Sequence, residues 1–191
     1  MKNIIIVAHP DDEAIWFSSI LRKRDTALFF CFQNKYLPNQ KENLKYTNKV
    51  FEIIKLYENI LPTIWLQTIK TTKPRIFGKV SPATKKHLEG NLYSILKITS
   101  PKKIYTHNPY GEYGHSEHVL VHQILKKIAG YKLIFPSPQN KTSLLFKKAG
   151  INQVDIHFRE TLFNWYKKRG IWTGVKGEPY GEKEEFYKYK R

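Results

Sequence analysis

The chain has 191 residues, a formal net charge of +17 and a single cysteine, Cys31. One cysteine excludes an intrachain disulfide, and a chain of this length buries a sufficient core without such cross-links. The charge would permit an anionic partner, but the lysines are spread from Lys2 to Lys190 rather than clustered. We therefore expect no nucleic-acid partner.

The hydrophobic runs bear on the cellular location of the protein, and its length bears on the number of domains. Only five apolar residues separate Asn3 from His9, too few for the core of a signal peptide, and no later run reaches the length of a membrane span. We expect a cytoplasmic protein without a membrane span. The length predicts one domain over residues 1–191, with about 150–191 as a variable C-terminal part.

Short apolar runs alternate along the chain with longer amphipathic segments. The first run, Asn3–Ala8, is continuous and rich in β-branched residues, which favours a strand buried on both faces of a parallel sheet. Pro10 ends this strand, and a helix is expected from there to Lys23. Further strands are expected at 26–32, 60–66, 103–107 and 132–136. Further helices are expected at 39–57, 82–98, 115–129, 142–148 and 161–168, whereas 68–81 and the last twenty residues are expected to be irregular.

This alternation of strands and helices predicts an α/β fold. We expect a single-domain Rossmann-like sheet, mostly parallel, with helices on both faces. Ligands bind such sheets at the carboxyl ends of the strands. Two segments occupy that position and carry most of the reactive side chains: the turn after the first strand and the loop after the 103–107 strand.

The turn after the first strand crowds ionisable side chains together. His9, Asp11, Asp12 and Glu13 fall within five positions. Neighbouring carboxylates repel each other, and a divalent cation would compensate for that repulsion. A histidine with a carboxylate is a zinc-type ligand pair, so one aspartate can bind metal while the other faces a reacting water. The alternative is that an aspartate caps the helix and Glu13 completes an acidic first turn, which leaves the histidine and the second aspartate unexplained.

The second segment, residues 106–118, is rich in histidine. His115 and His118 are three positions apart at the start of a helix, so they share a face. His107, at the strand end, suits a ligand, a substrate contact or a hydrogen-bonded structural group, and we favour the structural group. His122 makes a ligand spacing with His118, but we favour a packed or surface histidine there.

Residues of both segments supply a ligand set for one metal ion. His9, Asp12 and His118 give two imidazoles and one carboxylate, which leaves a further position open for water. An open position marks a catalytic zinc site, and the sequence has no cysteine cluster for a structural one. We expect Zn²⁺, although Fe²⁺ or another divalent ion also suits these ligands.

The segment Ala8–Glu13 resembles the signature of the PIG-L/LmbE-like family of metal-dependent N-acetylglucosamine deacetylases. Gly114–His118 resembles the second, His-x-Asp-His-like motif of that family, in the same order along the chain. The pattern of strands and helices fits over roughly residues 1–150. The resemblance implies hydrolysis of the N-acetyl group of an N-acetylated amino sugar, with release of acetate. The implied partner is a small molecule or glycan that carries an N-acetylglucosamine-type sugar.

The resemblance also implies roles for individual residues. The three ligands named above match the zinc ligands of the family, and Asp11 matches the general base. A protonated His115 would stabilise the tetrahedral intermediate. Glu117 stands where the family usually has the aspartate that orients this histidine. One departure is the stretch 15–18, Ile-Trp-Phe-Ser, which replaces a small, glycine-rich helix start.

Six further residues are expected to contact the substrate. Aromatic rings offer stacking faces for a sugar, amide and carboxylate groups pair with hydroxyls, and an arginine suits a phosphate. The residues are Asn108, Tyr110, Glu112, Tyr113, Arg75 and Trp172. Aromatic residues beside glycines also anchor loops, and a solvated loop is the other interpretation of the segment around the arginine.

Two other functions use the same sequence features. One is a different metal-dependent amidase or phosphoesterase with the same ligands. The other is a non-catalytic, basic Rossmann-like protein that binds a nucleotide or nucleic acid. The second fits less well, because no glycine-rich phosphate loop follows the first strand, and the acidic turn at 9–12 would repel a phosphate without a metal.

Overall fold

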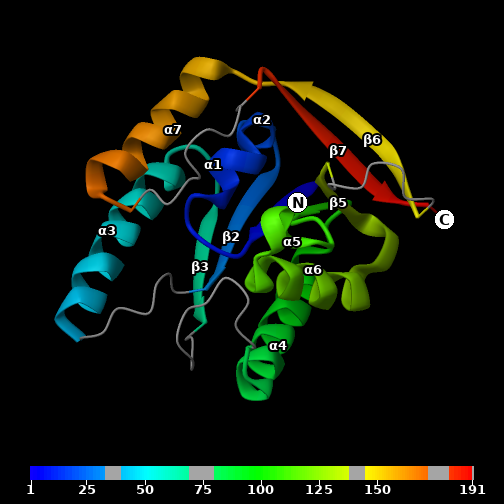
Figure 1. Ribbon diagram of the computed structural model, residues 1–191, viewed down its shortest axis with the longest axis horizontal. Helices are drawn as coiled ribbons and strands as arrows, with labels where there is room; N and C mark the ends of the chain where they lie inside the picture. Colours follow the sequence, from blue (N-terminus) through cyan, green and yellow to red (C-terminus); the bar gives the residue numbers. More distant parts are fainter. Residues whose placement is uncertain (33–39, 69–79, 138–144, 172–180, 191) are drawn as a thin grey trace.

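The computed structural model of the protein describes residues 1–32, 40–68, 80–137, 145–171 and 181–190 (Figure 1). The strands within these ranges are β1 (Asn3–Val7), β2 (Thr26–Phe32), β3 (Thr63–Thr68), β4 (Lys103–Thr106), β5 (Leu133–Pro136), β6 (Phe146–Gln153) and β7 (Lys183–Tyr189). The helices are α1 (Asp12–Trp16), α2 (Ser18–Leu21), α3 (Gln40–Glu58), α4 (Pro82–Thr99), α5 (Gly111–Gly114), α6 (Ser116–Ala129) and α7 (Ile156–Arg169).

The strands form one sheet in the order β3-β2-β1-β4-β5-β7-β6. Strands β1 to β5 pair in parallel, whereas β7 pairs antiparallel with both β5 and β6. The expected α/β fold with a mostly parallel sheet is thus confirmed. The strand order reverses between β1 and β4, because β2 and β3 extend the sheet on one side and β5 on the other. Ligand sites of such sheets lie beside this reversal, at the carboxyl ends of the strands.

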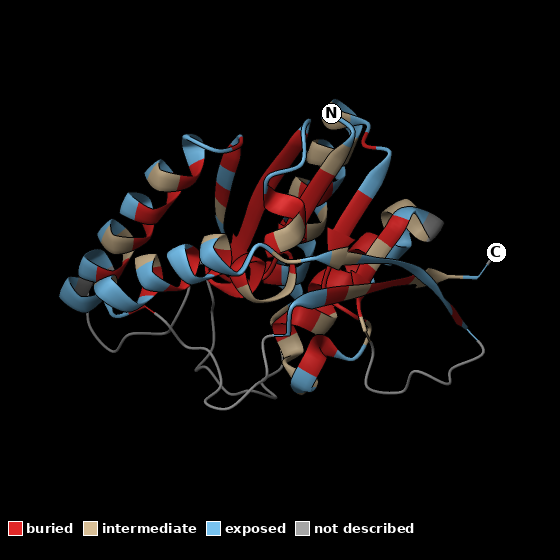
Figure 2. Cartoon of the chain, turned by 90° about the horizontal axis from the view of Figure 1, so that it is seen from above, coloured by how far each residue is buried: buried red, intermediate tan, exposed pale blue. Residues whose placement is uncertain are grey.

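Helices cover both faces of the sheet, and each face has its own hydrophobic core. On one face, α1, α2, α3 and α7 pack over Ile5 and Val7 of β1. On the other face, α4 and α6 pack over Ile4 and Ile6. This division follows from the two-residue period of a strand. The central strands are buried along most of their length (Figure 2).

The C-terminal part of the chain differs from the sequence-based expectation. The expected helix at 142–148 is wrong, because β6 begins at Phe146, and residues 142–144 lie outside the described residues. The last twenty residues, expected to be irregular, contain β7. Gly150, which suggested the end of a helix, lies where the register between β6 and β7 shifts. A glycine at such a shift is typical of a β-bulge.

Two expected helices are present with different bounds. The first is interrupted at Phe17 (φ −137°, ψ 16°), which divides it into α1 and α2. The ring of Phe17 is buried and stacks on Phe186. The helix expected at 161–168 begins earlier, because the Asp155 side chain accepts the N–H of Phe158 and caps α7. Within the described ranges, no helix has the length and apolar character needed to cross a bilayer.

Candidate active site

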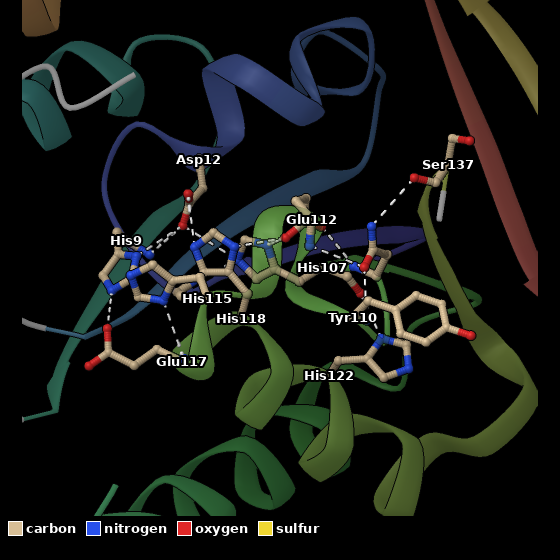
Figure 3. Close-up of polar contacts among 12 residues, drawn as sticks. His9, Asp12, His107, Tyr110, Glu112, His115, Glu117, His118, His122 and Ser137 are labelled. Carbon is tan, nitrogen blue, oxygen red and sulfur yellow. Dashed lines mark hydrogen bonds and ion pairs between the residues drawn. The ribbon is translucent and has the colours of Figure 1, made fainter. Parts of the chain in front are cut away.

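The candidate site lies where β1 and β4 end side by side. The two strands pair in parallel with Ile6 opposite Thr106, so the segments that follow them emerge at the same edge of the sheet. A hydrogen bond joins these segments, since the N–H of Ala8 donates to Nε2 of His107 at 2.9 Å. The side chains of the β1 turn and of α6 therefore face one another (Figure 3).

Asp12 lies between two histidine rings. One of its carboxylate oxygens is 3.4 Å from Nδ1 of His9, and the other is 3.3 Å from Nε2 of His118. The backbone N–H of His9 also donates to Asp12 at 2.7 Å. All three side chains are buried. The fold thus brings together the three residues that were expected as metal ligands from two distant segments.

Each of these histidines has a second carboxylate behind it. Glu117 accepts a hydrogen bond from Nε2 of His9, and Glu112 accepts one from Nδ1 of His118 at 2.7 Å. The same oxygen of Glu112 accepts a hydrogen bond from Nδ1 of His107 at 3.0 Å. A carboxylate on the far nitrogen fixes the ring tautomer and directs the lone pair of the near nitrogen inward, as is common behind metal-bound histidines.

The backbone holds Glu112 in an unusual conformation, with φ 56° and ψ −73°. Such a conformation costs a non-glycine residue about 1–3 kcal/mol and persists only where the surroundings enforce it. The Asn108 side-chain oxygen accepts the N–H of Glu112 at 3.1 Å and that of Tyr110 at 2.9 Å. Glu112 in turn accepts the N–H of Asn108 at 2.8 Å through its second oxygen. Both carboxylate oxygens thus engage protein groups, which favours a role in holding the histidines over the substrate contact expected from the sequence.

The charges of the site are strongly coupled. Burial would raise the pKa of Asp12, but the charges of His118 and His107 hold it well below its usual value. Burial would likewise raise the pKa of Glu112, but the same two histidines lower it to about 2. Burial would lower the pKa of His118, yet Asp12 and Glu112 raise it to about 10. The two carboxylates therefore favour positive charge at this ring.

This arrangement fits a metal cation. In the part of the chain that the structure describes, no group hydrogen-bonds the buried Nε2 of His118, which faces a carboxylate oxygen of Asp12 at 3.3 Å. Among the described residues, one ligand atom from each of His9, His115 and His118 lies within 4.8 Å of the others, and so do those of Asp12, His107 and His118. An unpartnered imidazole nitrogen, a facing carboxylate and a second imidazole match the donor set of a catalytic zinc site.

His107 and His122 both make hydrogen bonds within the protein, which favours the structural interpretation of these two histidines. Nε2 of His107 accepts the N–H of Ala8, and its Nδ1 donates to Glu112, so both ring nitrogens are engaged. Nδ1 of His122 donates to the carbonyl of His107 at 2.6 Å, and its Nε2 accepts the hydroxyl of Tyr189 at 2.7 Å. Burial lowers the pKa of His122 to about 4, and a neutral ring satisfies both contacts.

His115 stands beside the ligand cluster at the start of α6. Its ring centroid is 4.8 Å from that of His9 and 4.5 Å from that of His118. Burial, reinforced by the charges of those two rings, lowers the pKa of His115 to about 3. Its Nδ1 accepts the backbone N–H of Glu117 at 3.3 Å, which leaves Nε2 to carry the proton. The ring is thus a neutral donor in this arrangement, whereas the family resemblance implies a protonated one.

Asp11 occupies the tightest point of the turn after β1. Its φ of 109° and ψ of −26° lie in a region that residues with side chains seldom adopt. Its backbone carbonyl accepts the N–H groups of Ala14 and Ile15, so the backbone of Asp11 starts α1. Its side chain is buried and makes no capping hydrogen bond to the helix. The simple interpretation of Asp11 as a side-chain cap therefore does not hold.

Glu13 is fully buried, so its role goes beyond an acidic first turn of the helix. One of its oxygens accepts hydrogen bonds from the hydroxyls of Tyr57 and Tyr166, and the other accepts the N–H of Asp11 at 3.0 Å. Burial raises the pKa of Glu13 to about 7, and the two tyrosine hydrogen bonds act in the opposite direction. Sequence reasoning missed this contact, because the two tyrosines lie 44 and 153 positions away.

Of the two tyrosines expected to contact substrate, only one borders the histidines. The ring of Tyr113 meets those of His115 and His118 edge-on, at centroid distances of 5.9 and 5.6 Å. Tyr113 remains 41% exposed, so part of it is accessible to solvent. Tyr110 packs its ring against Phe146 and points away from the metal-ligand cluster (Figure 3).

Asn108, another expected substrate contact, has a structural role in the loop after β4. Asn108 is buried, and its amide organises the loop after β4. It also donates to the carbonyl of Ser137 at 3.4 Å. Arg75 and Trp172 lie outside the described residues.

Several solved structures share this fold. A deacetylase in complex with bog, from the biosynthesis pathway of teicoplanin, aligns with a TM-score of 0.65 at 11% identity, over 99% of this chain and 97% of that chain. A triple mutant of a deacetylase from the teicoplanin pathway aligns with a TM-score of 0.69 at 11% identity, over 100% and 98%. The A40926 pseudoaglycone deacetylase Dbv21 aligns with a TM-score of 0.62 at 11% identity, over 98% and 96%. No protein-family model and no curated protein matches the sequence. The chain therefore has the fold of these deacetylases over nearly their whole length.

Proposed function

We propose that this protein is a zinc-dependent N-deacetylase that hydrolyses the N-acetyl group of an N-acetylated amino sugar. The observation that carries the proposal is the position of Asp12 between His9 and His118, together with the buried Nε2 of His118, for which the described residues provide no hydrogen-bond partner. The shared fold with solved deacetylases supports the reaction class. The amino sugar comes from the motif resemblance.

His9, Asp12 and His118 would hold the zinc ion, which when bound would lower the pKa of water to about 7 and polarise the amide carbonyl. The resemblance implies that Glu117 orients His115, but the carboxylate of Glu117 bonds His9. Glu117 and Glu112 would therefore orient the two ligand imidazoles through the nitrogens that face away from Asp12. The protein thus contributes a donor set whose tautomers are fixed before the metal arrives.

Asp11 is the proposed general base. It follows Pro10 on the strained turn, next to the ligand Asp12, and its buried carboxylate would take a proton from the attacking water. The same carboxylate would then pass that proton to the nitrogen of the leaving amine. Water adds to the acetyl carbonyl and the C–N bond breaks, so the products are acetate and a free amine.

His115 is placed to stabilise the charge that develops on the acetyl oxygen. As a neutral ring it donates through Nε2, which is sufficient to hydrogen-bond an oxyanion. One such donor contributes on the order of 3–4 kcal/mol to transition-state stabilisation. Tyr113, half-exposed beside His115, is the side chain best placed to contact the sugar.

Metal analysis followed by an acetate assay tests this function. The purified protein is expected to bind zinc stoichiometrically and to release acetate from at least one member of a panel of N-acetylated sugars and glycosides. Asp11→Asn is expected to retain zinc and lose turnover by about 10²- to 10⁴-fold, because it removes only the base. Zinc-loaded protein that releases no acetate but cleaves a phosphate ester or another amide would replace this function with a different hydrolase activity.

A further inference from the structure

A buried carboxylate with two tyrosines lies directly behind the turn that carries Asp11. Glu13 has no exposed surface, and its carboxylate accepts hydrogen bonds from three separate parts of the chain. Tyr57 of α3 and Tyr166 of α7 donate to one oxygen, and the backbone N–H of Asp11 donates to the other. Both tyrosine side chains are fully buried as well.

The carboxylate of Glu13 holds the backbone N–H of Asp11, the residue with the strained conformation. Asp11 has φ 109°, and such a conformation persists only when surrounding contacts enforce it. The N–H bonded by Glu13 belongs to the peptide that enters this residue, so the hydrogen bond limits rotation of the turn. Rotation there would redirect the Asp11 side chain relative to Asp12, with which it shares a peptide bond.

The two hydroxyls fix the carboxylate in turn. Tyr57 packs its ring against Phe30 of β2 and Trp165 of α7, and both tyrosines belong to the hydrophobic core on that face of the sheet. Helices α3 and α7 therefore set the position of the Glu13 carboxylate, which the residues of the turn alone would not do.

We propose that Glu13, Tyr57 and Tyr166 form a tyrosine–glutamate clamp whose function is to position Asp11. Both hydroxyls of the clamp bond the carboxylate of Glu13, and that carboxylate bonds the backbone of Asp11, so its members are positioning residues rather than catalytic ones. The proposal rests on the proposed function in so far as Asp11 acts as the base. The competing interpretation is that the tyrosines merely satisfy a buried carboxylate and stabilise the fold.

The variants Tyr57→Phe, Tyr166→Phe and the double variant test the clamp, because each removes a hydroxyl and keeps the ring. Tyr187→Phe is the matched control, since that ring is also buried in the core and its hydroxyl donates to Glu185 of β7 at 3.2 Å. Two quantities are measured on the full-length, zinc-loaded protein. The first is the amide ¹H–¹⁵N chemical shift of Asp11, and the second is the kcat and KM of acetate release.

We expect the Asp11 amide resonance to move in each clamp variant and most in the double variant. The kcat of the double variant should fall about 10- to 100-fold, because displacement of a catalytic group by about 1 Å costs up to that much. KM and zinc affinity should stay within about threefold, and the control should change neither the resonance nor kcat. A merely structural role would lower only the folded fraction and leave kcat per folded molecule unchanged.

An unmoved Asp11 resonance in the double variant would overturn the clamp, whatever the activity. A resonance that moves while kcat per folded molecule stays at the wild-type value would also overturn it, because the positioning would then have no consequence. If the wild type releases no acetate but the resonance moves, the clamp holds the turn and the proposed function fails. The two failures are thus distinguishable.

Discussion

In the turn after β1, Asp11 adopts a φ of 109° and the carboxylate of Glu13 binds its backbone N–H. In the loop after β4, Glu112 adopts a φ of 56°, and its own carboxylate binds two imidazole rings. Both regions thus combine a strained backbone with a buried carboxylate. In the first, the carboxylate holds the backbone of the proposed base, whereas in the second it holds the rings of His107 and His118. Loss of the Glu13 contact should therefore impair turnover, and loss of the Glu112 contacts should impair metal retention.

The largest effect on the β4 side is expected for Glu112→Gln. A glutamine has one accepting oxygen, so its NH₂ group would oppose a donor now bonded by the carboxylate. Zinc affinity, measured by competition with a chromophoric chelator, should fall about 10- to 100-fold, and activity should recover at saturating zinc.

Glu185→Gln is the control for that variant, because Glu185 pairs with Lys148 at 3.0 Å and lies away from the histidines. Its zinc affinity should equal that of the wild type. Unchanged zinc affinity in Glu112→Gln would remove the distinction between the two regions.

The next effect is a pH-dependent loss of stability at His122, whose ring bonds the carbonyl of His107 in the segment after β4. Its pKa is about 4 in the folded protein against an ordinary value of 6.5, so between these values only the unfolded chain binds the proton. The stability linked to His122 is therefore present above pH 6.5 and lost as pH falls toward 4. The loss over this window is on the order of 3 kcal/mol.

Urea unfolding of the zinc-free protein at pH 7.5, 5.5 and 4.5 measures this loss. His122→Gln should be less stable than the wild type at pH 7.5, because its amide replaces the two ring contacts only in part. Its stability should also fall less steeply on acidification. Parallel pH profiles for the two proteins would show that His122 does not carry this dependence.

The smallest effect is expected at Gly111, which precedes Glu112 with a φ of 68°. An added Cβ would lie 2.9 Å from the Val119 side chain, so Gly111→Ala should destabilise the protein by about 1–2 kcal/mol. Gly90→Ala is the matched control. That position lies inside α4 with nothing within 4 Å of the new Cβ, so the variant should gain about 0.5–1 kcal/mol. Equal denaturation midpoints for both variants would contradict the strain assigned to the loop.

Features that depend on a short stretch of sequence could be predicted from the sequence. The apolar run of β1 and the histidine-rich segment after β4 placed His9, Asp12 and His118 at one edge of a parallel sheet, and the structure brings them together. The tyrosine–glutamate clamp had no local signal, because it depends on how α3 and α7 pack.

Two other features were not predicted, because the residues that form them suit more than one structure or role. Glu112 stood among polar residues that suit a sugar, and only its backbone conformation directs it to the histidines. Gly150 ends helices and also forms bulges, so the strand β6 was mistaken for a helix. The charged residues in Lys183–Tyr189 obscured β7, in which even Glu184 is buried.

The most direct test of the account compares zinc content and acetate release in the wild type and in Asp11→Asn. The account predicts equal, stoichiometric zinc in both proteins and release of acetate from an N-acetylated amino sugar by the wild type alone. Full activity in Asp11→Asn, or a zinc-loaded wild type that deacetylates no member of the sugar panel, would contradict it.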